Sequence, residues 1–213
     1  MQAALFDLDG TLFDSLGIWE DIDRRFFQER GLELPADYAG SISGLSFRQT
    51  AEYTKERFDL KMSVDGIVSV WHDMCLDEYV HRVELKPGAG AYLKKLKRAG
   101  RKLAVVTTLT KELYEPALKR NGVYDLFDVF ATTDESSAHK KTGKVYLLAA
   151  SRLQTPPNEC AVFEDIAEGI EGAKAAHMTA CLVYDRHNAD RLDCARRSAD
   201  HYIESYEGLE LWT

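Results

Sequence analysis

Short, continuously apolar runs recur along this chain, and from the second onward each is separated from the next by enough residues for a helix. Runs that are apolar at every position are typical of strands buried on both faces, as in a parallel sheet flanked by helices. The resulting β-α-β-α order predicts an α/β fold. The predicted strands are residues 3–6, 103–107, 129–132, 161–163 and 180–184.

The region from about residue 16 to residue 82 breaks this alternation, because no convincing strand pattern occurs in it. Apolar residues recur at helical spacing in residues 18–26 and again in residues 64–75, and a weaker helical pattern runs from residue 46 to about residue 58. We therefore expect three or so helices, inserted after the first strand as a separate helical subdomain.

The formal net charge of −8 argues against nucleic acid or an anionic membrane as the main partner. No charge-free stretch approaches the roughly 20 residues of a membrane-spanning helix, and the N-terminal residues lack the pattern of a secretory signal. The four cysteines lie far apart without a CxxC pair, which favours reduced thiols. These features predict a cytoplasmic protein. Such an acidic chain can still bind a phosphorylated metabolite when a metal ion offsets the repulsion.

Two acidic residues, Asp7 and Asp9, directly follow the first predicted strand. On a strand, residues i and i+2 point the same way, which would put these carboxylates side by side. Ligands of open parallel sheets bind beyond the carboxyl ends of the strands. Adjacent carboxylates require a cation or a shared proton, and Mg²⁺ with its preference for oxygen ligands fits best. Alone, the pair would indicate only an acidic turn.

Two other predicted strands also end in polar residues. Glu164 and Asp165 follow strand 161–163, although Asp165 by itself would be interpreted as a helix N-cap. Thr107 ends strand 103–107 and Thr108 follows it, and the two offer a hydroxyl and backbone N–H groups to an anion at the start of the next helix. Ordinary helix capping is the alternative interpretation of the threonines.

A lysine cluster precedes a predicted helix that begins near Val145, and alone it would be a solvated surface run. Together with the acidic and threonine residues, it completes a set of groups suited to phosphoryl transfer. That set contains a nucleophilic carboxylate, an acid/base carboxylate, a metal-binding acid, and a hydroxyl and an ammonium for the phosphate oxygens. The cluster consists of Lys140, Lys141 and Lys144.

The chain resembles the haloacid dehalogenase-like superfamily, specifically its β-phosphoglucomutase-like branch with a helical cap. Residues 6–15, Phe-Asp-Leu-Asp-Gly-Thr-Leu-Phe-Asp-Ser, are similar to the first motif of that family, Thr107 falls at the second, and residues 162–176 are similar to the fourth. The resemblance implies a Rossmann-like core of residues 1–15 and 84–213, with a helical cap of residues 16–83.

The resemblance also implies roles for individual residues. Asp7 attacks phosphorus, while Asp9 protonates the leaving oxygen and then activates the water that hydrolyses the aspartyl-phosphate. Mg²⁺ is held by Asp7, the backbone carbonyl of Asp9 and Asp165, with Glu164 in support. Thr107 and a lysine of the third motif hold the transferring phosphoryl group, with Thr108 beside them.

The third motif is where this sequence departs from the family pattern. The family shows Gly-Lys-Pro, a further proline and then an aromatic residue, whereas the prolines are missing here. Counting back from the aromatic Tyr146 selects Lys140 as the phosphate-binding lysine. Without the prolines the loop could shift, which leaves Lys141 and Lys144 as alternatives.

We therefore expect a Mg²⁺-dependent phosphatase acting on a small phosphorylated metabolite such as a sugar phosphate. A sugar-phosphate mutase is the alternative, but Trp19 stands where the mutases have a cap histidine, and their cap arginine falls at Phe47 with Arg48 one place off. Trp19 and Arg48 are candidate substrate-contacting residues of the cap. Dehalogenation is disfavoured by Asp9 and Asp165, and a non-catalytic phosphometabolite-binding protein is the remaining alternative.

Overall fold

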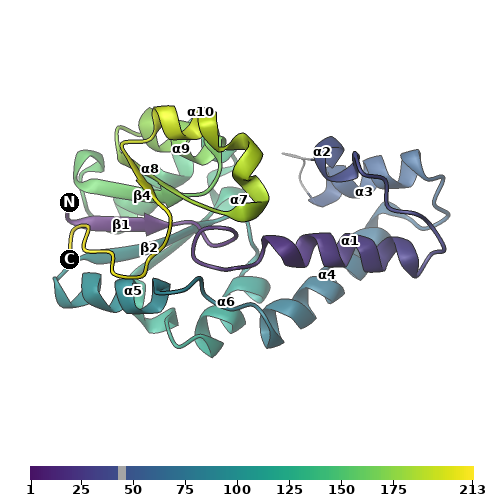
Figure 1. Ribbon diagram of the computed structural model, residues 1–213, viewed down its shortest axis with the longest axis horizontal. Coiled ribbons are helices and arrows are strands. Elements are labelled where there is room, and N and C mark those ends of the chain that lie inside the picture. Colours follow the sequence, from purple (N-terminus) through teal and green to yellow (C-terminus); the bar gives the residue numbers. More distant parts are fainter. Residues whose placement is uncertain (43–46) are drawn as a thin grey trace. The chain divides into compact units, whose positions relative to one another are not determined.

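The computed structural model of this chain describes residues 1–42 and 47–213. Within them the chain forms two compact units, Met1–Leu16 with Val83–Thr213 and Gly17–Arg82 (Figure 1). The boundaries expected from the sequence, after residues 15 and 83, lie beside these limits. The role of the smaller unit as a cap stays a prediction.

The larger unit is built on a six-stranded parallel sheet with the strand order β3-β2-β1-β4-β5-β6. This arrangement confirms the predicted α/β class. The expected strands all form, although the fifth ends at Val183, so that Tyr184 lies outside it. The sixth strand was not predicted, because it has only three residues and its first two are incompletely buried. The strands are β1 Ala3–Phe6, β2 Lys102–Thr107, β3 Val129–Thr132, β4 Cys160–Glu164, β5 Thr179–Val183 and β6 His201–Ile203.

Helices cover both faces of this sheet, with α8, α9 and α10 on one side and α5 and α6 on the other (Figure 1). Their α-helical bounds are α5 Ala89–Arg98, α6 Lys111–Arg120, α7 Thr133–Ser136, α8 Lys144–Arg152, α9 Ala167–Ala175 and α10 Leu192–Ser198. Short 3₁₀ helices lie between them at η1 Tyr124–Leu126, η2 Lys140–Thr142, η3 Pro157–Glu159 and η4 Arg186–Arg191.

The central strand β1 shows why the apolar runs are continuous. Leu5 is fully buried in the cluster that α8 and α9 form with one face of the sheet. Phe6 faces the opposite layer, where its ring stacks on Phe163 at 4.4 Å and meets the edge of Tyr92 from α5 at 6.5 Å. Successive side chains of a strand point to opposite faces, and here both faces are covered.

The smaller unit is helical, and its described part contains no strand. Phe27 lies at its centre, with ring centroids 5.0 Å from Tyr38 and 4.7 Å from Phe58. The weak helix expected over residues 46–58 forms as α3, while its expected first residue, Ser46, lies outside the described residues. The helices are α1 Leu16–Gln28, α2 Tyr38–Ile42, α3 Phe47–Arg57 and α4 Val64–His81. None of the described helices is long and apolar enough to span a bilayer.

The ends of the larger unit's two segments are joined by backbone hydrogen bonds. The Asp14 N–H donates to the Glu84 carbonyl at 3.0 Å, and the Lys86 N–H donates to the Leu12 carbonyl at 2.8 Å. This pairing fixes the segment that follows β1, which contains Asp9.

Candidate active site

The turn after β1 brings its polar residues back against the carboxyl end of the sheet. The Leu8 carbonyl accepts hydrogen bonds from the N–H groups of Thr11, Leu12 and Phe13, which tightens the turn. Gly10 has a φ of +72°, and a Cβ there would overlap the carboxylate of Asp165. Glycine is therefore required both by the backbone conformation and by the close approach of an acidic side chain.

Three buried carboxylates meet at this end of the sheet. Asp7 follows β1, whereas Glu164 ends the neighbouring β4 and Asp165 comes next. One oxygen of each lies within 4.8 Å of the others. The register that pairs Phe6 with Phe163 places the two acidic segments side by side. Adjacent parallel strands therefore bring together residues that are distant in the sequence.

Lys140 is the lysine that enters this cluster. Its buried ammonium donates to Asp7 Oδ1 at 2.5 Å and lies 2.7 Å from Glu164 Oε1. By contrast, Lys141 is exposed and pairs with Glu171 at 2.9 Å, and Lys144 is exposed at the start of α8. The loop without prolines thus keeps the first of the three lysines at the acidic cluster.

The position of Lys140 depends on a small residue in α9. A Cβ on Gly172 would overlap the backbone carbonyl of Lys140 and contact the ring of Tyr146. Because Gly172 has no side chain, the 3₁₀ turn η2 packs directly on α9, and the lysine side chain reaches the carboxyl ends of β1 and β4.

The charges of this cluster do not balance, because three carboxylates face one ammonium. Burial raises the pKa of Glu164 to about 7, although Lys140 opposes this shift. Burial and the neighbouring Asp7 carboxylate likewise hold the pKa of Asp165 well above its usual range. For Lys140, burial works to lower the pKa, but the charges of Asp7 and Glu164 outweigh it and raise the pKa. The cluster therefore favours additional positive charge.

These residues fit a hard divalent cation. The donors are carboxylate oxygens, which Mg²⁺ prefers. Glu164 Oε2 is buried and has no hydrogen-bond partner among the described residues. Buried polar atoms are almost always satisfied, so this oxygen is suited to a partner that the described protein atoms do not supply, such as a water molecule or an ion.

Asp9 is not a member of this group of three carboxylates. The expectation that it continues the strand beside Asp7 is wrong, because β1 ends at Phe6 and Asp9 belongs to the turn that follows. Its Oδ1 accepts a hydrogen bond from the Ser15 hydroxyl at 2.6 Å. The turn leaves Asp9 half-buried at the same end of the sheet as Asp7.

The two threonines after β2 have different environments. Thr107 is buried, and its hydroxyl accepts a hydrogen bond from the Leu109 N–H at 3.1 Å, whereas Thr108 is exposed. Neither starts a helix, which corrects the expected placement, because α6 begins at Lys111 with Thr110 as N-cap. Thr107 therefore ends a strand that is adjacent to β1.

Asp165 is not a helix N-cap, since Ile166 holds that position in α9. The carboxylate of Asp165 instead accepts hydrogen bonds from the Thr11 hydroxyl at 3.2 Å and from the Asn188 amide at 2.6 Å. The Tyr146 hydroxyl donates to Glu164 Oε1 at 2.7 Å. In the sequence, Tyr146 marks only the aromatic position of the third motif, and no pattern points to Asn188.

The two cap candidates lie in the smaller unit. The half-buried ring of Trp19 meets the edge of Phe47 at 5.9 Å and lies 6.4 Å from Tyr79. Arg48 forms an exposed ion pair with Asp65 at 2.5 Å. Their contact with a substrate stays a prediction.

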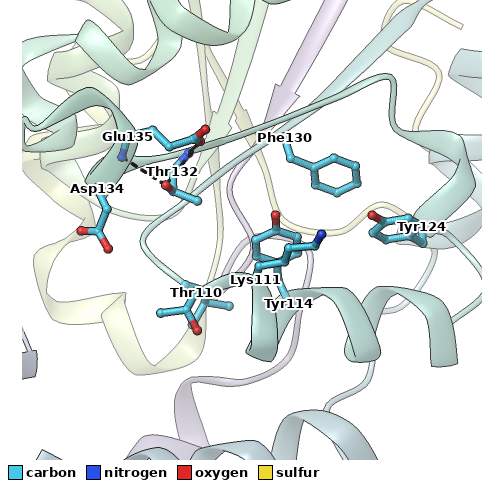
Figure 2. Close-up of a pocket in the computed structure, with 9 residues that line it drawn as sticks. Thr110, Lys111, Tyr114, Tyr124, Phe130, Thr132, Asp134 and Glu135 are labelled. Atoms are coloured by element: carbon cyan, nitrogen blue, oxygen red, sulfur yellow. Dashed lines mark hydrogen bonds between the residues drawn. The ribbon is translucent and has the colours of Figure 1, made fainter.

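A separate pocket of about 450 Å³ lies at the outer edge of the sheet. Figure 2 shows the aromatic side chains that line it, in which Phe130 of β3 stacks with Tyr114 at 5.5 Å and with Tyr124 at 4.9 Å. Glu135, on the rim of this pocket, forms an ion pair with Arg152 at 2.7 Å and accepts a hydrogen bond from the backbone N–H of Thr132. The pocket includes no member of the acidic cluster.

Known proteins are similar to this chain in sequence and in fold. The family described as haloacid dehalogenase-like hydrolase matches residues 4–183. A phosphorylated carbohydrates phosphatase from Thermotoga maritima is 28% identical over 176 residues, covering 83% of this chain and 82% of its own length. Validoxylamine A 7'-phosphate phosphatase from Streptomyces hygroscopicus subsp. limoneus is 30% identical over 192 residues, covering 90% and 89%. The crystal structure of CbbY from Rhodobacter sphaeroides in complex with phosphate has the same fold, with a TM-score of 0.83 at 22% identity over 99% of this chain and 96% of that chain.

Proposed function

The chain belongs to the haloacid dehalogenase-like hydrolase family, and from that premise we propose that it is a Mg²⁺-dependent phosphatase that hydrolyses a phosphorylated sugar through an aspartyl-phosphate. The relatives named above are phosphatases, of phosphorylated carbohydrates in one case and of validoxylamine A 7'-phosphate in the other. These names support the phosphatase activity and the substrate class.

The observation that carries the proposal is the buried group of Asp7, Glu164 and Asp165 around the ammonium of Lys140. Phosphoryl transfer depends mainly on positioning and on stabilising negative charge. A nucleophilic carboxylate can attack a phosphate dianion only where positive charge surrounds it. The lysine supplies part of that charge, and the excess of carboxylates is suited to a divalent cation.

In the proposed reaction an oxygen of Asp7 attacks phosphorus, and the bond from phosphorus to the sugar oxygen breaks. Asp9 gives its proton to that oxygen, so that the sugar leaves as an alcohol. Asp9 then takes a proton from a water molecule, which attacks phosphorus and releases inorganic phosphate and the Asp7 carboxylate. Thr107 and Lys140 hold the phosphoryl oxygens, with Thr108 beside them.

The metal site of this proposal consists of Asp7, the Asp9 backbone carbonyl and Asp165, with Glu164 in support. A bound Mg²⁺ would supply charge neutralisation between the nucleophile and the phosphate. Glu164 is oriented by the Tyr146 hydroxyl and the Lys140 ammonium, which together occupy its Oε1 and leave Oε2 available.

The experiment is to incubate p-nitrophenyl phosphate and a panel of sugar phosphates, glucose 1-phosphate included, with the protein in the presence and absence of Mg²⁺. We expect inorganic phosphate to appear in equal amount to the dephosphorylated product and only with the metal. Glucose 1-phosphate is also tested with and without a bis-phosphate activator. Conversion to an isomeric sugar phosphate without phosphate release would contradict the proposed phosphatase activity and indicate a mutase.

A further inference from the structure

Both oxygens of the Asp165 carboxylate are held by neutral donors. Oδ1 accepts a hydrogen bond from the Thr11 hydroxyl at 3.2 Å, and Oδ2 accepts one from the Asn188 amide at 2.6 Å. Thr11 belongs to the turn after β1, while Asn188 comes from the segment that follows β5. One hydrogen bond to each oxygen restricts the orientation of the carboxylate without cancelling its charge.

Asn188 is itself held by Asp185, the residue at the N-terminal end of η4. The backbone N–H of Asn188 donates to the Asp185 carbonyl at 3.2 Å. The Asp185 side chain accepts a hydrogen bond from the His187 N–H at 2.8 Å. This turn determines where the Asn188 backbone lies and therefore where its amide can reach.

Asp185 is buried, and its charge is compensated by Lys86. The Lys86 ammonium lies 2.8 Å from Asp185 Oδ2 and donates to the Tyr184 carbonyl at 2.7 Å. The side chains of this ion pair are 12% and 2% exposed, so that solvent can replace little of the interaction. A single lysine thus secures both the end of β5 and the turn that carries Asn188.

We propose that Asn188 is a positioning residue that orients the metal-binding carboxylate of Asp165, and that the Lys86–Asp185 ion pair holds Asn188 in place. The inference rests on the proposed function, because it requires Asp165 to bind the cation. Groups that hydrogen-bond to metal ligands orient them, and their replacement typically weakens metal binding by about 10–100-fold.

A neutral donor is well suited to this role. An ammonium at the position of Asn188 would bind the same oxygen but would also repel the cation. The amide leaves the negative charge of Asp165 available, because it donates a hydrogen bond and carries no charge. The loss of this one hydrogen bond should therefore act on metal affinity rather than on the nucleophile.

The test measures Mn²⁺ binding to the full chain by electron paramagnetic resonance, without substrate, together with turnover over a range of Mg²⁺ concentrations. For Asn188→Ala we expect the Mn²⁺ dissociation constant to rise about 10-fold or more. We expect kcat to return close to the wild-type value at saturating Mg²⁺. Recovery by metal separates positioning from general damage to the site, which added metal would not repair.

A matched control is Asn158→Ala, which makes the same substitution at an exposed position in η3, just before β4 begins. Its Mn²⁺ affinity should equal that of the wild type.

The second arm of the test concerns the ion pair. Lys86→Met alone would leave a buried carboxylate without its partner and could prevent folding. Lys86→Met combined with Asp185→Asn removes both charges and keeps an oxygen for the His187 N–H. We expect this double variant to weaken Mn²⁺ binding, and adding Asn188→Ala to it should cause a smaller further loss than in the wild type, since both act on the same carboxylate.

The possible outcomes separate the inference from the function on which it rests. A wild-type protein that releases phosphate without metal and binds no Mn²⁺ would overturn the proposed metal-dependent function and this inference with it. A wild-type protein that binds Mn²⁺, with Asn188→Ala binding it equally well, would overturn the inference alone. If Asn188→Ala bound Mn²⁺ more weakly but its turnover stayed low at saturating Mg²⁺, that result would also contradict the positioning role.

Discussion

Lys140 and Asp7 are 133 residues apart in the sequence, yet the lysine ammonium donates a buried hydrogen bond to Asp7 Oδ1 at 2.5 Å. The same ammonium lies 2.7 Å from Glu164. It therefore connects the residue after β1 with the last residue of β4, at the point where the proposed reaction takes place.

Replacing Lys140 should impair catalysis far more than replacing either neighbouring lysine. For Lys140→Met we expect turnover of p-nitrophenyl phosphate to fall about 100-fold or more, because the charged group proposed to hold the transferring phosphoryl is lost. Lys141→Met and Lys144→Met are matched controls at exposed positions and should keep near-normal rates. A larger loss in either control than in Lys140→Met would mean that another lysine binds the phosphate.

Asp7→Asn should abolish turnover while leaving the fold intact. The amide is nearly the same size as the carboxylate but is a very poor nucleophile, and removal of a nucleophile commonly costs about 10⁴-fold or more. The substitution also removes one of three buried carboxylates, which relieves repulsion. Phosphate release gives the rate, and circular dichroism checks the fold. Near-normal turnover by this variant would show that Asp7 is not the nucleophile.

Metal binding should stabilise the protein and chelation should remove its activity. Carboxylates as close as Asp7, Glu164 and Asp165 repel one another, and a cation that binds only the folded state shifts the unfolding equilibrium by about 2.7 kcal/mol at 100 times its dissociation constant. The measurement is the melting temperature with and without Mg²⁺. Phosphatase activity that survives thorough treatment with EDTA would contradict the metal dependence.

The stability of the smaller unit should depend on Asp23. Burial, aided by the charge of Glu20, raises the pKa of Asp23 in α1 to about 7 from its ordinary value near 3.8. Between these two values the folded state holds a proton that the unfolded state has released, so the free energy of unfolding falls as the pH rises through this range and changes no further above about 7.

Asp23→Asn removes this titration, because the amide cannot ionise. At pH 8 the variant should be more stable than the wild type by roughly 2 kcal/mol, since one pKa unit corresponds to about 1.4 kcal/mol and partial exposure reduces the effect. Near pH 4 the two proteins should differ little. Denaturant unfolding at both pH values provides the measurement, with Asp21→Asn at an exposed position of α1 as the control. An equal effect of Asp23→Asn at pH 4 and pH 8 would exclude the titration.

Much of the fold could be predicted because its signals are local. The apolar run that became β1 has the predicted bounds, since burial on both faces leaves a continuous mark in the sequence. The strand β3 also has the predicted bounds, although Ala131 is its only buried residue. The strand β6 was missed because three residues with incomplete burial carry no such mark.

The residues of the candidate site could also be predicted only in part. Motifs near strand ends identified Asp7, Glu164 and Asp165 as candidates, because the carboxyl ends of parallel strands meet at one edge of a sheet whatever the details of packing. Asp9 was named as a candidate from the same motif, but the strand alternation used to place it beside Asp7 does not apply. The strand ends at Phe6, and the hydrogen bonds of the turn that follows determine the backbone conformation at Asp9.

The sequence by itself determined the fold class, the family and the acidic groups of the site, since each follows from short local segments and from their order along the chain. Only the tertiary structure decided which lysine meets Asp7 and which residue holds Asp165. Lys140 reaches the cluster because η2 packs against Gly172 of α9. Asn188 reaches it from the turn after β5, which the buried Lys86–Asp185 ion pair holds in place in the proposal above. These contacts join segments that are distant along the chain, and the packing that creates them leaves no local pattern of residues.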